Sequence, residues 1–295
     1  MKRIFAGLLV IVILMTFSAC GVSSDTELEK PAGVSGGSTG TTQKTATEDV
    51  TIEEMVLVDE AGVKITAKSL ETDNLFGADL KLLIENNSGK NLTFQCRNSS
   101  VNGYMVETLM SIDVADGKKA NDKLTFSSSD LELCGIDTIA DMEFSFHIFT
   151  SEDWETYLDT ALIQIKTSIA DSYTYTYDDS GEVAYEGKDI KIVIKGLTKD
   201  SSIFGPGIVV YIENNNKKNV SVQARDVSIN GFMVDAIFSA DVISGKRAVD
   251  TITFMDTDLE ENDITEIEDV ELFFHIFDMD SWDDIVDTDV VKIDF

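Results

Sequence analysis

Alternating apolar and polar positions run through this chain and predict that most of it forms β-strands. Residues 92–97 and 220–225 each place three apolar side chains at every second position, with polar side chains between them. A period of two with one apolar face is typical of a half-buried strand. Shorter apolar runs at 80–84 and 208–212 end in Glu-Asn-Asn, which favours a strand followed by a turn.

Turn sequences separate these strands at regular intervals. Asn102-Gly103 and Asn230-Gly231 lie between apolar segments, and Asn-Gly supplies the positive φ angles of a tight type I′ hairpin turn. A hairpin-like lead-in is expected from strands at 173–177 and 182–185. Further strands are predicted near residues 124–126, 144–148, 162–166, 252–254, 272–276 and 290–294. In the strands at 144–148 and 272–276, three large apolar side chains share one face, which we expect to be the interior.

The whole pattern occurs twice. Ile84-Glu85-Asn86-Asn87 returns 128 positions later with no change, as do Phe146-His147-Ile148-Phe149 and Trp154. About 40 of about 90 aligned positions are identical, which indicates an internal duplication. We call residues 50–170 repeat 1 and residues 171–295 repeat 2.

Each repeat has the length and strand content of an all-β domain. Seven or eight short strands in about 115 residues, with turns every 8–12 residues, predict a two-sheet β-sandwich with Greek-key connections. No segment shows a long 3.6-residue period. The best helical candidates are single turns near 151–157 and 280–286.

The N-terminus carries a targeting signal. Met1-Lys2-Arg3 is basic, residues 4–15 are almost wholly apolar, and Ser18-Ala19-Cys20 follows. These features predict a secretory signal over residues 1–19, which is too short for a comfortable membrane span. The cysteine after small residues resembles the bacterial lipoprotein signal, which implies that Cys20 is lipidated and becomes the first residue. An ordinary signal peptide and an uncleaved anchor are the alternatives.

A linker follows the signal. Residues 20–49 are rich in Gly, Ser and Thr and have no apolar period, so they are expected to be disordered. About 30 such residues have a root-mean-square span of roughly 30 Å. We therefore expect the folded part to be held away from a membrane surface.

The two repeats, the lipidation signal and the linker together resemble the uncharacterised bacterial lipoproteins that carry tandem immunoglobulin-like domains. The resemblance implies two immunoglobulin-like sandwiches, lipid-anchored to the cell membrane and facing outside the cytoplasm. It implies no reaction, and Cys20 is the only functional residue that it assigns.

The charge of the chain limits its partners. The formal net charge is -31, and the signal removes two basic residues, Lys2 and Arg3, so the mature chain is more acidic still. Nucleic acid and anionic lipid need a basic face and are therefore not expected as partners. A solvated acidic surface is the simplest interpretation, while cationic partners and divalent ions remain open.

Histidine and tryptophan occur only at matching positions. His147 and His275 lack flanking ligands at a metal-binding spacing, so we interpret them as structural residues on the outer face of a strand. Trp154 and Trp282 follow acidic turns, and we expect each to form a buried lid over one end of its sandwich. Stacking on a sugar is the alternative for both.

The remaining chemical candidates are acids and cysteines. Asp256, Asp258 and Glu260 echo a calcium loop, but the glycine and the final acid of such a loop are missing. Cys96 and Cys134 both fall in repeat 1, and a disulfide between them is left open. No cofactor motif is present, so none is expected.

These observations favour a non-catalytic, lipid-anchored cell-surface protein that binds or spaces an unknown extracellular protein or glycan. No Ser-His-Asp arrangement and no Gly-x-Ser-x-Gly motif occurs, so we expect no enzyme. The alternative is a cell-envelope glycan-acting hydrolase or its accessory carbohydrate-binding domain. The candidate binding surface lies at the two hairpin tips, at Asn102, Tyr104, Met105, Asn230, Phe232 and Met233.

Overall fold

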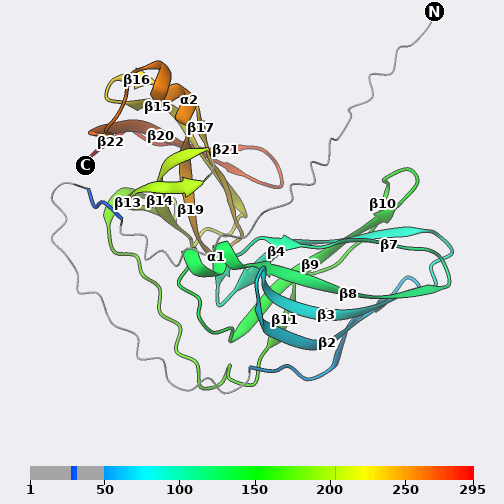
Figure 1. Ribbon diagram of the computed structural model, residues 1–295. Helices are drawn as coiled ribbons and strands as arrows, with labels where there is room; N and C mark the ends of the chain where they lie inside the picture. Colours follow the sequence, from blue (N-terminus) through cyan, green and yellow to red (C-terminus); the bar gives the residue numbers. More distant parts are fainter. Residues whose placement is uncertain (1–27, 32–49, 203) are drawn as a thin grey trace, which may run out of the picture.

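The computed structural model describes residues 28–31, 50–202 and 204–295, and the chain over these residues is nearly all β (Figure 1). The signal peptide, Cys20 and most of the linker lie outside the described residues. Repeat 1 contains β1 (Met55–Glu60), β2 (Val63–Asn74), β3 (Gly77–Asn86), β4 (Leu92–Val101), β5 (Tyr104–Met105), β6 (Thr108–Leu109), β7 (Ser111–Val114), β8 (Lys118–Ser127), α1 (Ser128–Leu133), β9 (Asp141–Thr150), β10 (Thr156–Asp159) and β11 (Ile163–Lys166).

Repeat 2 contains the same elements in the same order. They are β12 (Glu182–Gly187), β13 (Ile190–Ser202), β14 (Gly205–Asn214), β15 (Val220–Ile229), β16 (Phe232–Met233), β17 (Ala236–Ile237), β18 (Ser239–Val242), β19 (Arg247–Phe254), α2 (Asp256–Glu261), β20 (Asp269–Asp278), β21 (Asp284–Asp287) and β22 (Val291–Asp294).

Each repeat builds two antiparallel groups of strands. In repeat 1, one group has the order β1-β2-β3-β8-β6, and β4 and β9 form the centre of the other with β5, β7, β10 and β11. In repeat 2, β12-β13-β14-β19-β17 corresponds to the first group, and β15 and β20 lie at the centre of the second. The all-β expectation is confirmed, and this arrangement is consistent with a sandwich.

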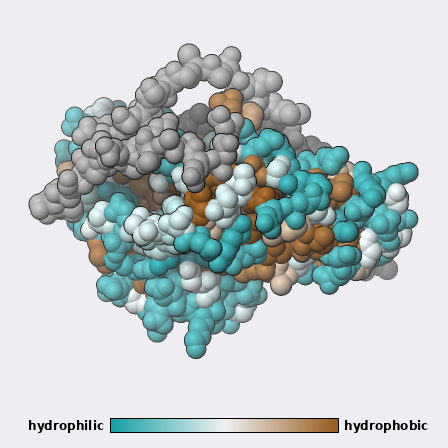
Figure 2. Space-filling view, turned by 90° about the horizontal axis from the view of Figure 1, so that it is seen from below, coloured by the Kyte–Doolittle hydropathy of each residue, from teal (hydrophilic) through white to brown (hydrophobic). Residues whose placement is uncertain are grey.

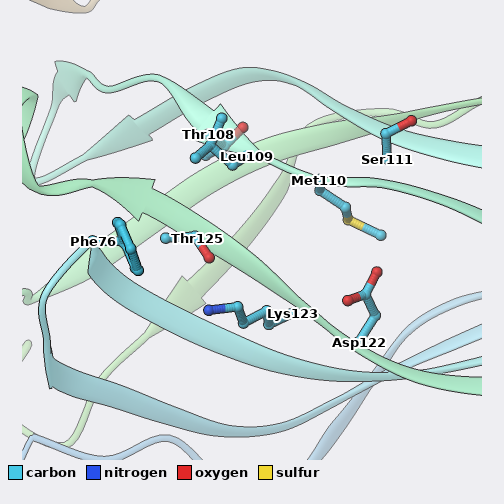
Figure 3. A pocket seen from close by; sticks show the side chains of 8 residues that line it. All are labelled: Phe76, Thr108, Leu109, Met110, Ser111, Asp122, Lys123 and Thr125. Atoms are coloured by element: carbon cyan, nitrogen blue, oxygen red, sulfur yellow. The ribbon is translucent and has the colours of Figure 1, made fainter. Parts of the chain in front are cut away.

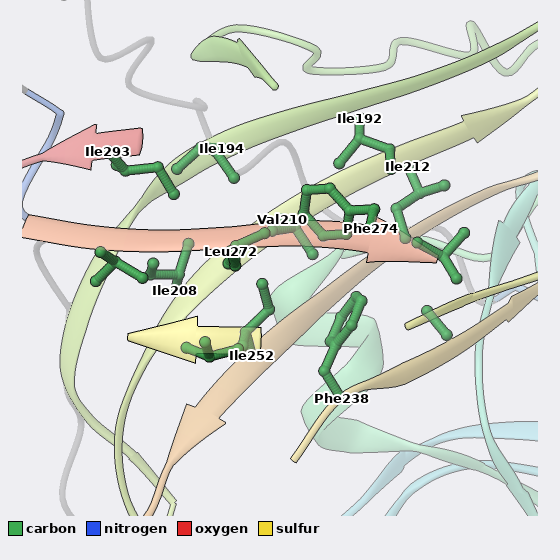
Figure 4. Packing of buried hydrophobic residues seen from close by; sticks show 14 of the residues in the cluster. Ile192, Ile194, Ile208, Val210, Ile212, Phe238, Ile252, Leu272, Phe274 and Ile293 are labelled. Atoms are coloured by element: carbon green, nitrogen blue, oxygen red, sulfur yellow. The ribbon is translucent and has the colours of Figure 1, made fainter. Parts of the chain in front are cut away.

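Side chains from both groups of each repeat meet in one hydrophobic cluster, and Figure 4 shows that of repeat 2. In repeat 2, Leu272 and Phe274 from β20 pack with Ile194 and Val210 from β13 and β14, and all four are at most 1% exposed. In repeat 1, Phe144 and its neighbours at alternate positions of β9 do the same. The expected interior face of these strands is therefore confirmed.

The expected hairpin turns are also present. Asn102 and Gly103 have φ angles of 51° and 84°, and Asn230 and Gly231 have φ angles of 51° and 82°. Positive φ at both central residues is the requirement of the type I′ turn that Asn-Gly favours.

Two expectations about local structure are wrong. Residues 151–157 and 280–286 form turns leading into β10 and β21, whereas the helices are α1 and α2. The Ser127 hydroxyl caps α1 by accepting the Asp130 amide, a local signal that needs no long apolar period. The lead-in hairpin is formed by β12 and β13, since residues 173–177 contain no strand.

The segment at 173–177 instead crosses repeat 1. The Tyr173 hydroxyl accepts a hydrogen bond from the Asn102 side-chain Nδ2 at 3.2 Å, and the Tyr175 hydroxyl donates to the Asp141 carboxylate. These side-chain hydrogen bonds fix the segment to the repeat that precedes it.

The two repeats join through a direct contact. Tyr104 of β5 pairs with Arg247 of β19 in a parallel bridge, which merges one group of strands from each repeat into an 11-stranded sheet. The Arg247 guanidinium lies 3.7 Å from the centre of the Tyr177 ring and 2.5 Å from the Glu213 carboxylate. Tyr104, Val193 and Tyr211 form a small hydrophobic cluster between the repeats. A stacked, ion-paired arginine inside apolar contacts restricts how the repeats turn against each other.

A short piece of the linker lies against repeat 2. Glu29 forms an isolated bridge with Leu197 through hydrogen bonds of 2.8 and 2.9 Å, and Pro31 is buried. The chain from the expected anchor therefore touches the second repeat before it enters the first.

The core position of Phe274 gives a first prediction. Phe274→Ala should lower the free energy of unfolding by about 3–5 kcal/mol, because it removes a fully buried aromatic ring. His275→Ala should cost only about 1 kcal/mol, because His275 lies on the outer face of β20 with a hydrogen bond to Asp287. Urea unfolding of both variants measures the two costs. Equal costs would contradict the register of β20.

The contact between the repeats gives a second prediction. Burial, and then the charges of Asp130 and Glu107, raise the pKa of Asp250 to about 6. The folded state then holds a proton between pH 4 and 6 that the unfolded state has lost, so this group stabilises the fold below about pH 4 and loses that contribution as pH rises through 6. Asp250→Asn should therefore raise the free energy of unfolding at pH 7.5 by about 1–2 kcal/mol.

The gain from Asp250→Asn should shrink toward zero at pH 4, where the wild-type carboxyl is itself neutral. Urea midpoints at the two pH values measure it. Asp122→Asn is the matched control, because Asp122 pairs with β3 as Asp250 pairs with β14 but lines an open groove. A gain that stays constant with pH would show that Asp250 is not the titrating group.

Candidate functional site

Trp154 and Trp282 are the most exposed aromatic side chains in the described chain. Each is 74% exposed, so the expectation of a buried lid is wrong for both. The physical reason is the turn that carries them, which extends past the end of the sheet before β10 or β21 begins. In Figure 1 the turns before β10 and β21 both extend toward the right-hand side of the view.

The backbone at both tryptophans is strained. Trp154 and Trp282 have φ angles of 62° and 63°, in the left-handed region that disfavours large side chains by roughly 1–2 kcal/mol. The Trp154 amide donates to the Thr150 carbonyl at 3.0 Å, and the Trp282 amide donates to the Asp278 carbonyl at 2.8 Å. The turn is therefore fixed by its hydrogen bonds. Glycine or asparagine would adopt this positive φ angle at a lower energy than tryptophan does.

One face of each indole rests on a phenylalanine. The rings of Phe149 and Trp154 are 5.5 Å apart and inclined by only 16°, and those of Phe277 and Trp282 are 5.6 Å apart and inclined by 18°. Since each tryptophan is mostly exposed, the opposite face of the ring is turned to solvent. The stack holds a flat apolar surface in one orientation.

A histidine extends each stack along the strand. The rings of His147 and Phe149 are 5.2 Å apart, and those of His275 and Phe277 are 5.3 Å apart. Each pair lies two residues apart on one strand, and such residues point to the same face of the sheet.

Polar side chains continue this row onto the neighbouring strands. The Asp159 carboxylate lies 2.5 Å from His147 Nδ1, and the Asp287 carboxylate lies 2.6 Å from His275 Nδ1. On the other side, Gln95 is directly opposite His147. We call these sets the indole ledges: ledge 1 is Trp154, Phe149, His147, Asp159 and Gln95, and ledge 2 is Trp282, Phe277, His275, Asp287 and Gln223.

Two carboxylates beside the ledges accept hydrogen bonds that favour their charged forms. Hydrogen bonds from Lys218 and from the Asp280 and Ser281 amides lower the pKa of Asp278 to about 2. A hydrogen bond from Thr150 lowers the pKa of Asp153. The ledges therefore present oxygen acceptors and no basic group of their own apart from the paired histidines.

The predicted binding surface at the hairpin tips is divided between two environments. In repeat 1, Asn102 and Tyr104 are 3% and 5% exposed, and Met105 packs against the core of repeat 2. The second repeat covers this tip, so it is an internal contact. In repeat 2, Phe232 and Met233 are 48% and 65% exposed.

The two asparagines at these tips have a structural task. The Asn102 carboxamide accepts the Ala140 and Asp141 amides and donates to the Thr138 carbonyl. The Asn230 carboxamide makes the corresponding bonds to the segment before β20. Both asparagines therefore tie the hairpin to the loop that precedes β9 or β20.

The calcium candidates lie on α2 and do not converge. Asp256, Asp258 and Glu260 are two residues apart on a helix, a spacing that points side chains to different faces. The Asp258 carboxylate accepts the Asp235 amide at 2.6 Å. Over the residues that the structure describes, no three His, Cys, Asp or Glu side chains are arranged to hold a metal ion.

The two cysteines of the described chain, Cys96 and Cys134, are free thiols. Burial raises the pKa of Cys96 to about 11 and that of Cys134 to about 12. The nucleophilic thiolate is therefore scarce at neutral pH.

An open groove of about 640 Å³ lies beside β6 and β8 in repeat 1 (Figure 3). Phe76 and Leu109, which are 65% and 68% exposed, flank it with Lys123 and Asp122. The surface in Figure 2 is mostly hydrophilic, with apolar side chains gathered in a few places. The groove brings together no pair of groups that suggests chemistry.

Comparison with known proteins finds no family model that matches the chain and no similar curated protein. Within the described residues, no helix is long and apolar enough to cross a membrane.

Sequence reasoning found each tryptophan and histidine but did not join them into one site. The missing signal was the spacing His-x-Phe followed five residues later by Trp, which occurs at 147–154 and again at 275–282. An aromatic residue two positions from the histidine shares its face of the strand, and that relation was available from the alternation alone.

Proposed function

We propose that this protein is a non-catalytic, lipid-anchored cell-surface protein with two immunoglobulin-like sandwich domains that hold an extracellular ligand on the indole ledges. The observation that carries the proposal is the presence of the same ledge, with ring separations that agree within 0.1 Å, in both repeats. An exposed indole that is held flat on a buried phenylalanine in both repeats supports contact with another molecule.

The contact between the repeats supports a role in display. Lys246 and Glu143 form an ion pair of 2.8 Å across it, and the Arg247 amide donates to the Gly103 carbonyl. Two ledges on repeats that are joined in this way keep a fixed relation to each other. The linker and the lipid on Cys20 then hold the pair at the cell surface.

The surroundings of the ledges favour binding over catalysis. A hydrolase of envelope glycans needs two facing carboxyl groups, one of them with a raised pKa. The carboxylates nearest the rings of the ledges, Asp159 and Asp287, are each hydrogen-bonded to a histidine on an open sheet face. This arrangement supports the accessory, carbohydrate-binding form of the alternative function more than the hydrolase.

The anchor gives a third prediction. Cys20→Ala should release the protein into the aqueous phase or leave it as unprocessed precursor, because acyl chains on Cys20 are the only strong anchor in this proposal. Detergent phase partitioning of cells that express either form measures the change. Cys96→Ala is the matched control and should partition like the wild type. Equal partitioning of the Cys20→Ala and wild-type proteins would contradict lipid anchoring.

A further inference from the structure

We infer that the two indole ledges are carbohydrate-binding sites, and that together they bind two segments of one neutral polysaccharide chain. This inference rests on the proposed function and adds the class of ligand and the residues that contact it. Trp154 and Trp282 supply the flat surface, and the polar row beside each supplies hydrogen bonds.

The form of the aromatic surface favours a sugar ring. In each ledge one indole face is held against a phenylalanine and the other is free, so the surface is flat, open and preorganised. A pyranose presents a flat array of C–H groups that packs on such a ring. A cation would be better held by several rings that enclose it, and each ledge offers a single free ring face.

The polar row next to the rings suits hydroxyl groups. Asp159, His147 and Gln95 lie in register on three adjacent strands, and Ser111 follows on the fourth. In ledge 2 the same order is Asp287, His275, Gln223 and Ser239. The carboxylate accepts hydrogen bonds, and the imidazole and carboxamide each have a donor and an acceptor, so the row offers both kinds of partner that a ligand with many hydroxyls requires.

The charge of the site selects a neutral ligand. Asp153 and Glu155 flank Trp154, and Asp283 and Asp284 follow Trp282 directly, so an anionic ligand would be repelled. The acids closest to the rings are occupied, since Asp159 and Asp287 pair with histidine and Asp278 pairs with Lys218 at 2.8 Å. They are therefore less available to attract a free cation.

Two equivalent ledges on connected repeats favour a polymer. Once one ledge has bound, the second meets a nearby segment of the same chain at a high effective concentration. A repeating polysaccharide offers the same unit to both ledges, whereas a unique protein epitope would not.

The chain contains two tryptophans, Trp154 and Trp282, so its intrinsic tryptophan fluorescence reports on the ledges alone. The full chain in detergent micelles is titrated with cellohexaose, chitohexaose and laminarihexaose, and with hexalysine as the cationic probe. We expect a saturable change in fluorescence with at least one of the hexasaccharides and none with hexalysine. Isothermal calorimetry with that hexasaccharide should give two sites per chain.

Variants then test the assignment. Trp154→Ala and Trp282→Ala should each leave one site, and each should weaken binding of the corresponding polysaccharide by roughly tenfold or more. Trp154→Tyr should retain two sites because it keeps a ring in the turn. Leu109→Ala, which removes an exposed apolar side chain outside the ledges, is the matched control and should bind like the wild type.

Binding of hexalysine without any hexasaccharide would overturn the inference, and so would the absence of binding by all four probes. Sugar binding that survives the Trp154→Ala, Trp282→Ala double variant would also overturn it, because the site would lie elsewhere. Urea unfolding of each variant confirms that it is folded. The Cys20→Ala partitioning experiment is independent of these titrations. A negative titration would therefore contradict polysaccharide binding without contradicting lipid anchoring.

Discussion

The ledge residues that lie on strands are placed on the outer face of the sheet because their neighbours along the strand are held in the core. Phe274 and Ile276 are fully buried, so His275 between them must point to the opposite face of the sheet. A shift of the strand by one residue would turn two large apolar side chains to the outer face and place the histidine in the hydrophobic core, so the core fixes the register. The same constraint sets Phe277 and Gln223 on the outer face, and the ledge is its consequence.

The register fixed by the core does not determine the positions of the two tryptophans, which lie on turns beyond the strands. Each indole contributes little to the core, because it is mostly exposed, and each backbone sits in a region that a large side chain avoids. Local strain of this kind persists where surrounding hydrogen bonds impose it. Stacking on phenylalanine accounts for one face of each indole, and the proposed ligand is a use for the other.

Much of the fold was predictable from the alternation of side chains, and the parts that were not depend on other interactions. The interior face of β9 and β20 and the Asn-Gly turns follow from short-range rules. The helices α1 and α2 were missed because six residues are too few for a 3.6-residue period. The prediction that Trp154 and Trp282 form buried lids was wrong because their exposure depends on how far the turn projects from the sheet. The apolar character of a side chain does not determine that distance.

The hairpin tips show why the candidate surface was only half predictable. Tyr104 and Phe232 occupy equivalent positions in the same motif, yet one is buried and the other is exposed. The difference comes from β19, whose Arg247 and Val249 face the first tip, and no pattern within either repeat encodes which neighbour will cover it. The tips therefore differ in environment because one is a contact between repeats, whereas the ledges share one environment.

The hairpin tips and the indole ledges differ in how the duplication has preserved them. The position that joins the repeats changed from tyrosine to phenylalanine and from buried to exposed, as expected where only one copy has a partner. In the ledges, the tryptophan is 74% exposed in both copies, and both copies kept the same tryptophan, phenylalanine, histidine, aspartate and glutamine. Packing explains the buried rings of this set, whereas the free face of each indole has no packing role, and the proposed ligand accounts for it in both repeats.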